Sequence, residues 1–529
     1  MTRRRERTKP ATVPFGATPA GEPPQVRDWA NPSVWTDRMV TTLEQGVRGG
    51  RWHTLIDKVY APLNLFTAMR SVVANEGAAG VDHQTTTHFE VHRQEELSRL
   101  EEALRTDSYR PQAVKRTWIP KPGSREQRPL GIPTVRDRVV QTALRNVIEP
   151  IFDATFARHS YGFRHGRGCH QALEHVEALL KEGYVYVVDA DLKSYFDTIP
   201  KDRMLDRVRE KVSDSRLLRL IEMFLQQGVM EDLKEWTPET GTPQGAVISP
   251  LLANIYLNPL DHALAAAGLN MVRYADDFVI LCRTREEAER ALALVQTWVA
   301  DNSLTLHPTR TKIVDARTEG FAFLGYEFRG DLRLPQDKSC QQLKDTVRRK
   351  TRRTNGESLS MICGSLSATL RGWFTYFRHC HPNAYTNLDS WTRMRLRSIL
   401  RRRSKRRGRG RGRNHQLWSN AYFTEQGLYS LVEAHARFCQ PSRGKPPTGK
   451  PCAGDPPARF GGRGSRTQSA LPTPIFSGAW RALGLGRGRL PARSWPRDGR
   501  WRRRGAAPRV GPCRRRTGRT VRGPSDRVP

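Results

Sequence analysis

Two groups of aspartates lie next to apolar runs in this chain and have the residue type that binds divalent metal ions. Asp189 and Asp191 follow directly on the β-branched run at 184–188. Asp276 and Asp277 stand between two short apolar runs, which predicts a hairpin with this pair in its turn. Asp is depleted from strands, so an acid at the end of an apolar strand is solvated, paired or metal-bound. Taken alone, the second pair favours an ordinary turn, because Asp is common there.

Carboxylates drawn from separate segments match the needs of a site with two metal ions. Two divalent ions about 4 Å apart require several carboxylate oxygens. Mg²⁺ takes one or two carboxylates and completes its octahedron with water and substrate phosphate oxygens. One ion would lower the pKa of an attacking 3′-hydroxyl, and the other would stabilise the charge on a leaving pyrophosphate. The constellation therefore predicts nucleotidyl transfer.

The elements that must position these acids alternate between helical and strand periodicity. Apolar residues recur at helical spacing over 140–148 and 291–298, which predicts two core-facing helices. The runs 271–274 and 278–281 predict the strands of a hairpin, joined by a turn at 275–277. The body of the chain is thus predicted to mix α and β, with helices packed on a short sheet.

The positive charge of the chain is concentrated in its last third. The whole sequence has 529 residues and a net charge of +36. Residues 441–529 hold 22 Lys and Arg against 3 acids, and residues 341–440 hold 21 against 5, which leaves the first 340 nearly neutral. This distribution predicts a catalytic body followed by a region that binds a polyanion such as nucleic acid.

Composition also limits what the ends of the chain can do. Residues 441–529 contain 15 Gly and 14 Pro with few apolar clusters, so we expect a disordered tail there. The sequence has no apolar stretch of about 18 residues, which argues against a membrane span, and its polar start is unlike a secretory signal, so we expect an intracellular protein. The eight cysteines form no Cys-x-x-Cys pair, which argues against a zinc ribbon.

The acids lie within a series of motifs that resembles, in order, the reverse transcriptases encoded by group II introns. The Tyr-Ala-Asp-Asp sequence at 274–277 is similar to the catalytic box of that family. The other matching segments are 75–82, 119–122, 128–138, 160–164, 191–197, 241–245, 249–254, 311–312 and 323–326. The resemblance covers roughly residues 60–435, and many ordered motifs are more specific than any one of them. Ala246 is a departure, because the family usually has Gly there.

The resemblance implies an α+β fold: a right-hand polymerase with fingers and palm, a helical thumb/maturase domain and a disordered basic C-terminal tail. We expect a partly disordered N-terminal extension at 1–55, fingers and palm at 56–335, and the thumb/maturase domain at 341–437. The tail would occupy 438–529. The paired cysteines of the nuclease module found in some relatives are missing, so no HNH-type endonuclease is expected.

The resemblance also implies roles for individual residues. Asp191, Asp276 and Asp277 would be the catalytic residues and would bind two Mg²⁺ ions. Phe196 would exclude a ribose 2′-hydroxyl and so favour dNTPs. The other residues expected at the nucleotide are Lys121, Arg128 and Gln244. The two basic ones could also belong to a solvated loop, and Lys312 either eases charge near the metals or lies on the surface.

A dense basic run in the thumb predicts a surface for RNA. A solvated face seldom carries so many like charges without a partner, because they repel one another, and phosphates relieve that repulsion. The residues expected to contact RNA are Arg393, Arg397, Arg401, Arg402, Arg403, Lys405, Arg406 and Arg407.

These features together predict an RNA-directed DNA polymerase of a group II intron that assists splicing as a maturase and copies intron RNA into DNA during mobility. The expected partners are intron RNA, target DNA with its primer 3′ end, and dNTPs, in the bacterial cytoplasm and at the nucleoid. No membrane partner is expected, and a homodimer is left open. Two alternatives are the reverse transcriptase of a diversity-generating or defence system, and an RNA-binding splicing factor with a vestigial polymerase. The Arg-Gly-Trp segment at 371–373 argues against the first, and the intact aspartates argue against the second.

Overall fold

The structure is a computed structural model, and its description covers most of the chain between residues 30 and 440. The described residues are 30–47, 49–120, 127–231, 234–238, 240–241, 245–330, 332–405 and 412–440. All of them belong to one unit of the chain, Met1–Gly484. Most of the expected N-terminal extension and nearly all of the expected tail, including the predicted disorder of the tail, lie outside the described residues.

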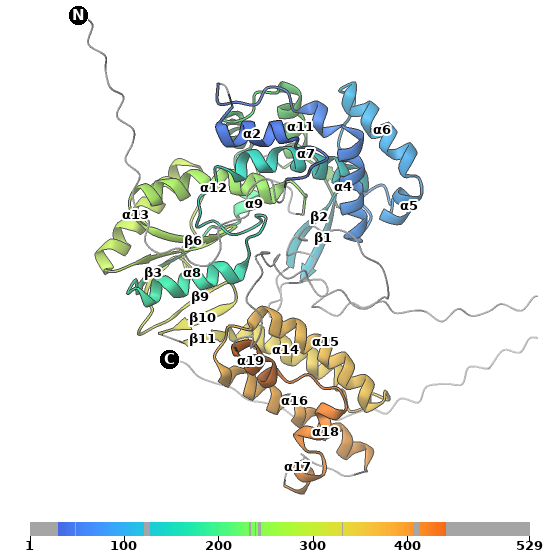
Figure 1. The fold of residues 1–529 in the computed structure, drawn as a ribbon, viewed down its shortest axis with the longest axis vertical. Helices are drawn as coiled ribbons and strands as arrows, with labels where there is room; N and C mark the ends of the chain where they lie inside the picture. Colours follow the sequence, from blue (N-terminus) through green and yellow to red (C-terminus); the bar gives the residue numbers. More distant parts are fainter. Residues whose placement is uncertain are drawn as a thin grey trace, which may run out of the picture. The chain divides into compact units, whose positions relative to one another are not determined.

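A long buried helix, α7 (Val135–Asp153), is central to the N-terminal half (Figure 1). The hydroxyl of Thr134 caps it by accepting a hydrogen bond from the backbone N–H of Asp137. Most of α7 is buried, because α4 and α12 both pack on it. The helices before it are α2 (Asp37–Gln45), α3 (Ile56–Val59), α4 (Pro62–Ala74), α5 (Thr86–Val91) and α6 (Arg93–Arg105).

The fingers contain a four-stranded sheet with the strand order β2-β1-β4-β5. Its strands are β1 (Val114–Pro120), β2 (Gln127–Ile132), β4 (Val229–Glu231) and β5 (Lys234–Trp236). β1 and β2 form an antiparallel pair in which Ile119 lies opposite Arg128. β4 joins β1 in parallel, so this sheet combines segments about 100 residues apart in the sequence.

The palm is a four-stranded antiparallel sheet with the order β6-β7-β3-β8. Its strands are β3 (Tyr186–Asp191), β6 (Asn270–Tyr274), β7 (Asp277–Cys282) and β8 (Lys312–Asp315). The helices of this region are α8 (Cys169–Lys181), α9 (Tyr195–Thr198), α10 (Lys201–Arg209), α11 (Ser215–Leu225), α12 (Ser249–Ala266) and α13 (Arg285–Asp301). The sheet is covered on both faces, because Val187 packs in the cluster that contains α8 and its neighbour Val188 packs in the cluster that contains α12 and α13.

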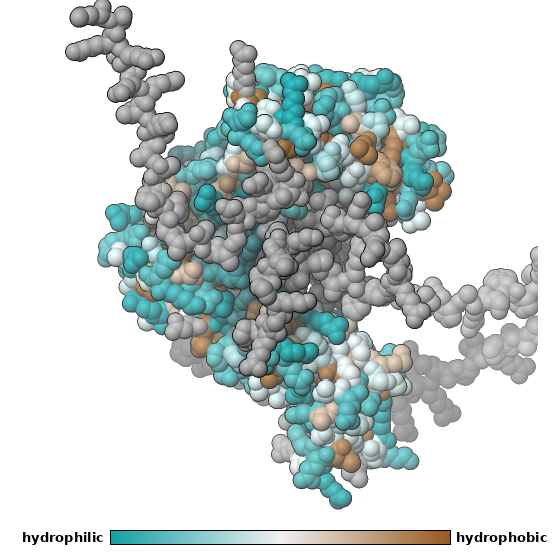
Figure 2. Space-filling view, in the orientation of Figure 1, coloured by the Kyte–Doolittle hydropathy of each residue, from teal (hydrophilic) through white to brown (hydrophobic). Residues whose placement is uncertain are grey.

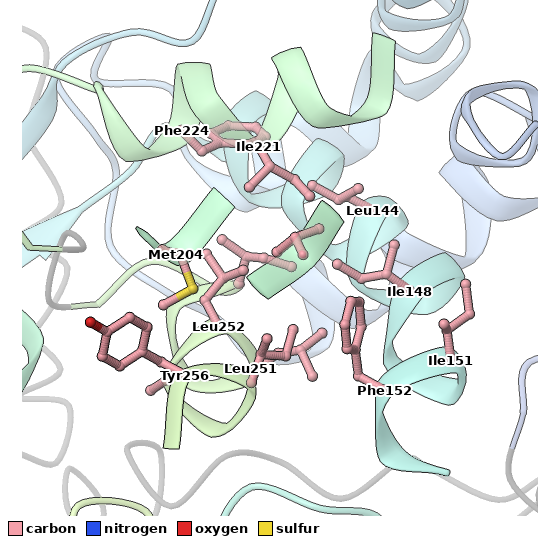
Figure 3. Packing of buried hydrophobic residues seen from close by; sticks show 14 of the residues in the cluster. Leu144, Ile148, Ile151, Phe152, Met204, Ile221, Phe224, Leu251, Leu252 and Tyr256 are labelled. Carbon is pink, nitrogen blue, oxygen red and sulfur yellow. The ribbon is translucent and has the colours of Figure 1, made fainter. Parts of the chain in front are cut away.

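The larger apolar cluster fixes the helices behind the palm. In Figure 3, Ile148 and Phe152 of α7 lie on the side of Leu251 and Leu252 of α12, and Leu144 lies near Ile221 of α11. These α7 residues recur at helical spacing, so one stripe of the helix is buried against its neighbours. The predicted core-facing helix at 140–148 is therefore part of the longer helix α7.

A small sheet and a helical thumb follow the palm (Figure 1). The sheet has the order β11-β10-β9, with β9 (Phe321–Phe323), β10 (Tyr326–Arg329) and β11 (Leu332–Pro335). The thumb helices are α14 (Asp337–Lys350), α15 (Leu359–Phe377), α16 (Pro382–Arg403), α17 (Arg413–Leu417), α18 (Asn420–Glu425) and α19 (Leu431–Cys439). Buried Asp389 of α16 accepts a hydrogen bond from the N–H of Leu431 at 3.1 Å and so holds the start of α19.

Two strand boundaries differ from their predictions. Asp277, expected in the hairpin turn, is the first residue of β7 because it pairs with Tyr274 and Asp191. The apolar run at 184–188 was expected to end before the acids, but β3 extends to Asp191. The reason is pairing on both sides, because β7 follows β3 as far as Asp191 and β8 follows it as far as Asp189. Among the described residues, no helix has the length and apolar character to cross a bilayer, and the face seen in Figure 2 is mostly hydrophilic.

Candidate active site

The palm sheet brings the two groups of aspartates to the same end. The register of β3 and β7 puts Asp191 directly opposite Asp277. Tyr274 pairs with Asp277 from the other side, so Ala275 and Asp276 form the turn between β6 and β7. Residues directly opposite on antiparallel strands share a face, with Cβ atoms about 4.5–5.5 Å apart. Three acids from two distant segments are therefore neighbours.

The turn that carries Asp276 has a tight backbone. Ala275 has φ +60°, in the left-handed region, which costs a residue with a Cβ about 1–2 kcal/mol. Gly162 lies so close that a Cβ on it would be 2.3 Å from the Ala275 nitrogen, so only glycine fits there. The close approach gives a physical reason for the glycine in the motif at 160–164.

A buried arginine, which the sequence analysis missed, ties this turn to α12. Arg273 and Asp261 are both fully buried, and Nε and Nη2 of Arg273 donate to the Asp261 carboxylate at 2.8 and 2.5 Å. Nη1 donates to Asn254 Oδ1 and to the carbonyl oxygen of Ala275, both at 2.9 Å. Asn254 donates in turn to the carbonyl oxygen of Gly162 at 2.8 Å. One guanidinium therefore connects the turn, α12 and the glycine segment.

Negative charge accumulates around Asp277. Burial, and after it the carboxylates of Asp189, Asp276 and Asp191, raise the pKa of this carboxyl to about 7. The backbone N–H of Leu324 acts in the opposite direction and lowers this pKa. A nearby cation would favour the ionised form of Asp277, because an opposite charge stabilises a carboxylate.

Asp189 is a fourth acid near this end of the sheet. The pKa of Asp189 is raised to about 6, chiefly by burial, with Lys312 acting to lower it and Asp191 to raise it. Lys312 begins β8 and lies opposite Asp189 in the register. Lys312 is exposed and lies beside the acids, so both of its predicted roles stay open.

Asp191 has a cationic partner in the structure. Arg310 Nη1 donates to Asp191 Oδ2 at 2.9 Å, and the Arg310 side chain is 67% exposed. Among the described residues, no three Asp, Glu, His or Cys side chains form a group with the geometry of a metal site. Because its side chain is mostly exposed, Arg310 can rotate away from Asp191 into solvent without disturbing buried contacts. The donors present are carboxylate oxygens, the ligands that Mg²⁺ and Mn²⁺ prefer, so the chemistry of the residues fits a divalent ion although their arrangement here is not that of a loaded site.

The predicted nucleotide-binding residues are only partly described. Phe196 is half-buried in α9, five residues beyond Asp191 in sequence. Gly241 lies against this helix, because a Cβ on it would be 2.7 Å from Asp197 Cα. Lys121 and Gln244 lie outside the described residues, and of Arg128 only the backbone is described, within β2.

The predicted RNA-binding residues separate into buried and exposed groups. Arg397 is buried: its Nε donates to the carbonyl oxygen of Trp418 at 2.9 Å and its Nη2 to Asn420 Oδ1 at 3.0 Å. Arg393 is largely buried against Asp389. Both arginines hold parts of the thumb together through these hydrogen bonds, and a contact of either with RNA stays a prediction. Arg402, Arg403 and Lys405 are exposed, Arg401 is half-buried, and Arg406 and Arg407 lie outside the described residues.

A basic cluster that the sequence analysis did not single out lies beside α16. Arg348 and Arg353 are exposed, and both act to lower the pKa of Arg395, after the larger effect of burial. Arg353 Nε donates to Ser398 Oγ at 2.8 Å, and the Arg348 guanidinium lies 5.5 Å from the centre of the Trp391 ring. We call Arg348, Arg353 and Arg395 the α14–α16 basic cluster. Like charges held this close favour an anionic ligand.

Comparisons with known proteins agree with this architecture. Residues 119–328 match the family model "Reverse transcriptase (RNA-dependent DNA polymerase)", and residues 340–418 match "Group II intron, maturase-specific domain". Protein YkfC of Escherichia coli K12 is 31% identical over 340 residues, which cover 55% of this chain and 89% of YkfC. The chain belongs to the family of group II intron-encoded reverse transcriptase/maturase proteins. In this family, the palm sheet is the centre of a reverse transcriptase domain, a type of polymerase that in general depends on divalent metal ions.

Other similarities are more limited in coverage. "Group II intron-encoded protein LtrA" of Lactococcus lactis is 36% identical over 198 residues, which cover 37% of this chain and 32% of LtrA. The chain thus matches about a third of the length of that relative. Among solved structures, a chain of a partial Cas6-RT-Cas1–Cas2 complex is 26% identical, covers 47% of this chain and 42% of its own, and has a TM-score of 0.32.

Proposed function

We propose that the chain is an RNA-directed DNA polymerase that also binds group II intron RNA, assists its splicing and copies it into DNA. The observation that carries this proposal is the register of Asp191 opposite Asp277, beside the turn that holds Asp276. The match of residues 340–418 to the maturase-specific domain supports the splicing role. We assign the fingers and palm to 56–335 and the thumb and maturase functions to 341–437.

We propose that Asp191, Asp276 and Asp277 hold two Mg²⁺ ions. When bound, these ions would lower the pKa of the primer 3′-hydroxyl and stabilise charge on the leaving pyrophosphate. The protein's own contribution is to hold the carboxylates in place: the β3–β7 pairing sets Asp191 against Asp277, and Arg273 fixes the turn. Arg310 would release Asp191 when the ions bind, because both cations use the same carboxylate.

Phe196→Ala is expected to admit ribonucleotides. The half-buried ring of Phe196 would contact the ribose at the 2′ position, so its removal leaves space for a hydroxyl. We expect the preference for dNTPs over rNTPs, measured as the ratio of kcat/KM values, to fall by roughly tenfold or more. Phe196→Tyr, which keeps a ring of similar size, is the control and should keep the preference. An unchanged ratio in the alanine variant would remove Phe196 from this role.

Neutralising the α14–α16 basic cluster is expected to weaken RNA binding in a salt-dependent way. Each lost phosphate contact lowers the slope of log K against log [salt] by about 0.7–0.9. Arg348→Gln with Arg353→Gln should therefore reduce the slope by about 1–2. The matched control is Arg99→Gln with Arg209→Gln, which removes the same charge from exposed ion pairs elsewhere. Equal slopes for the two double variants would contradict an RNA contact at the cluster.

The test of the proposed function is primer extension on an RNA template, run beside an in vitro splicing assay with group II intron RNA. We expect the purified chain to extend a DNA primer with dNTPs in the presence of Mg²⁺ and to accelerate splicing. Splicing assistance without extension would support instead a splicing factor with a vestigial polymerase. Extension of primers without any effect on intron RNA would contradict the maturase role.

A further inference from the structure

Two exposed tryptophans and an arginine meet on one face of the fingers sheet. Arg116 and Trp118 are two residues apart in β1, so their side chains stand on the same face of the sheet. The guanidinium carbon of Arg116 lies 5.0 Å from the centre of the Trp118 ring and 5.2 Å from the centre of the Trp236 ring in β5. One cation is thus held between indoles from two distant segments. We call Arg116, Trp118 and Trp236 the tryptophan platform.

A carboxylate fixes this arrangement from the strand between them. Glu231 ends β4, which lies between β1 and β5 in the sheet. The Nε1–H of Trp118 donates a hydrogen bond to Glu231 Oε1, and Glu231 Oε2 lies 3.8 Å from Nη1 of Arg116. The Trp118 indole is therefore oriented by the protein itself, and the charge of Arg116 is balanced by a neighbouring carboxylate.

The two rings are open to solvent. Trp118 and Trp236 are 43% and 39% exposed, whereas the other tryptophans that the structure describes are buried or half-buried. Pro129 and Gly131 of β2 lie opposite Trp118 and Arg116, and neither has a long side chain that could cover the rings. An exposed indole gains free energy when a flat apolar surface covers it. The platform is therefore suited to a planar ligand.

We propose that the tryptophan platform binds unpaired bases of RNA by stacking. Every base has a π-face, so aromatic side chains, with an arginine that adds a cation–π contribution, bind single strands with little regard to sequence. Bases within a duplex are already stacked on one another, so unpaired segments are the ones that can reach an aromatic ring. The proposal rests on the proposed function, because it takes RNA as the partner.

The platform differs in place and in chemistry from the other surfaces assigned to nucleotides and RNA. Ile119 lies opposite Arg128 in the register, and successive residues of a strand alternate between faces. Trp118 and Arg128 are thus on opposite faces of the β1–β2 hairpin, so the platform is separate from the predicted nucleotide-binding position. Because Glu231 balances Arg116, we expect the platform to contact bases, whereas the α14–α16 basic cluster contacts phosphates.

The experiment compares two RNA probes on the full chain. One is a single-stranded oligo(A) RNA with a central 5-iodouridine, and the other is a blunt RNA duplex, which offers no unpaired bases. Affinities are measured at high salt, because salt weakens the phosphate contacts of the basic segments more than it weakens base stacking. Irradiation then cross-links the iodouridine to an adjacent aromatic side chain, and mass spectrometry identifies the residue.

We expect Trp118→Ala and Trp236→Ala each to weaken oligo(A) binding by about 5–100-fold, the effect of one lost stacking contact, with duplex binding unchanged. Cross-links should form at Trp118 or Trp236. The control is Phe66→Ala in α4, which removes a ring with the same exposed fraction as Trp236, 39%, and should keep the affinity for oligo(A).

Four results would overturn the proposal: unchanged oligo(A) affinity in both tryptophan variants, an equal loss in Phe66→Ala, an equal loss of duplex binding, or cross-links at neither tryptophan. Primer extension and splicing by the wild type separate this inference from the proposed function. If both activities are present while oligo(A) affinity does not depend on the tryptophans, only the platform fails. If both activities are absent, the proposed function fails.

Discussion

The Asp277→Asn variant is expected to lose RNA-templated primer extension by on the order of a thousandfold or more, because a metal ligand is removed from a reaction that depends on charge stabilisation by metal ions. Asparagine has nearly the same shape as aspartate, so the strand pairing with Asp191 can persist. The measurement is single-nucleotide incorporation at saturating dNTP and primer–template.

The same variant should not be less stable than the wild type. Folding raises the pKa of Asp277 to about 7 from an ordinary value of 3.8. Its ionisation therefore lowers the free energy of unfolding as the pH rises above 3.8, and the loss is complete above about pH 7. In the absence of divalent ions at pH 8, Asp277→Asn should therefore unfold at the same temperature or a higher one. Loss of activity without loss of stability is the pattern of a functional residue.

The control for this prediction is Asp315→Asn. Asp315 lies in the same sheet, opposite Tyr186 at the far end of β3, and pairs with exposed Arg317. Its replacement should leave incorporation within a few-fold of the wild type. An Asp277→Asn protein that keeps a tenth or more of its activity would contradict the assignment of the acids.

The Arg273→Met variant is expected to lose about 3–5 kcal/mol of unfolding free energy, because it leaves Asp261 as a buried charge without its partner. It also leaves the carbonyl oxygen of Ala275 and the side chain of Asn254 without the donor that they share. Chemical denaturation measures the first effect, and primer extension measures the second.

A double variant separates the structural effect of Arg273 from its effect on the turn. Arg273→Met combined with Asp261→Leu replaces the ion pair by apolar groups, a change that often restores stability. We expect unfolding free energy to recover in large part while primer extension stays low, because the turn still lacks its donor. Recovery of both would show that Arg273 acts on stability alone.

The acids of the candidate site could be predicted from the sequence because their signal is local. An Asp pair between two apolar runs predicts a hairpin, and the structure has that hairpin, as β6 and β7. The end of β3 could not be predicted, because pairing with β7 and β8 carries the strand through Asp189 to Asp191. That pairing joins segments far apart in the chain.

The supporting arginines show where sequence reasoning failed. Arg273 stands in an apolar strand next to the acids, and a buried Arg requires a partner, but nothing in the sequence identifies Asp261 as that partner. Arg397 was interpreted as part of an exposed basic run. Arg393 and Arg397 are four residues apart on one helix face, and that face packs inside the thumb. Arg393 therefore pairs with Asp389, and Arg397 donates a hydrogen bond to the carbonyl oxygen of Trp418.

The most direct test of the metal assignment is to map where a bound divalent ion lies along the chain. Fe²⁺ replaces Mg²⁺ in the purified protein, and ascorbate with peroxide generates hydroxyl radicals that cut the backbone near the ion. We predict cuts around 189–191 and 274–278 that Mg²⁺ suppresses and that disappear in Asp277→Asn. Cuts confined to other segments, or an unchanged pattern in that variant, would contradict a metal site built from Asp191, Asp276 and Asp277.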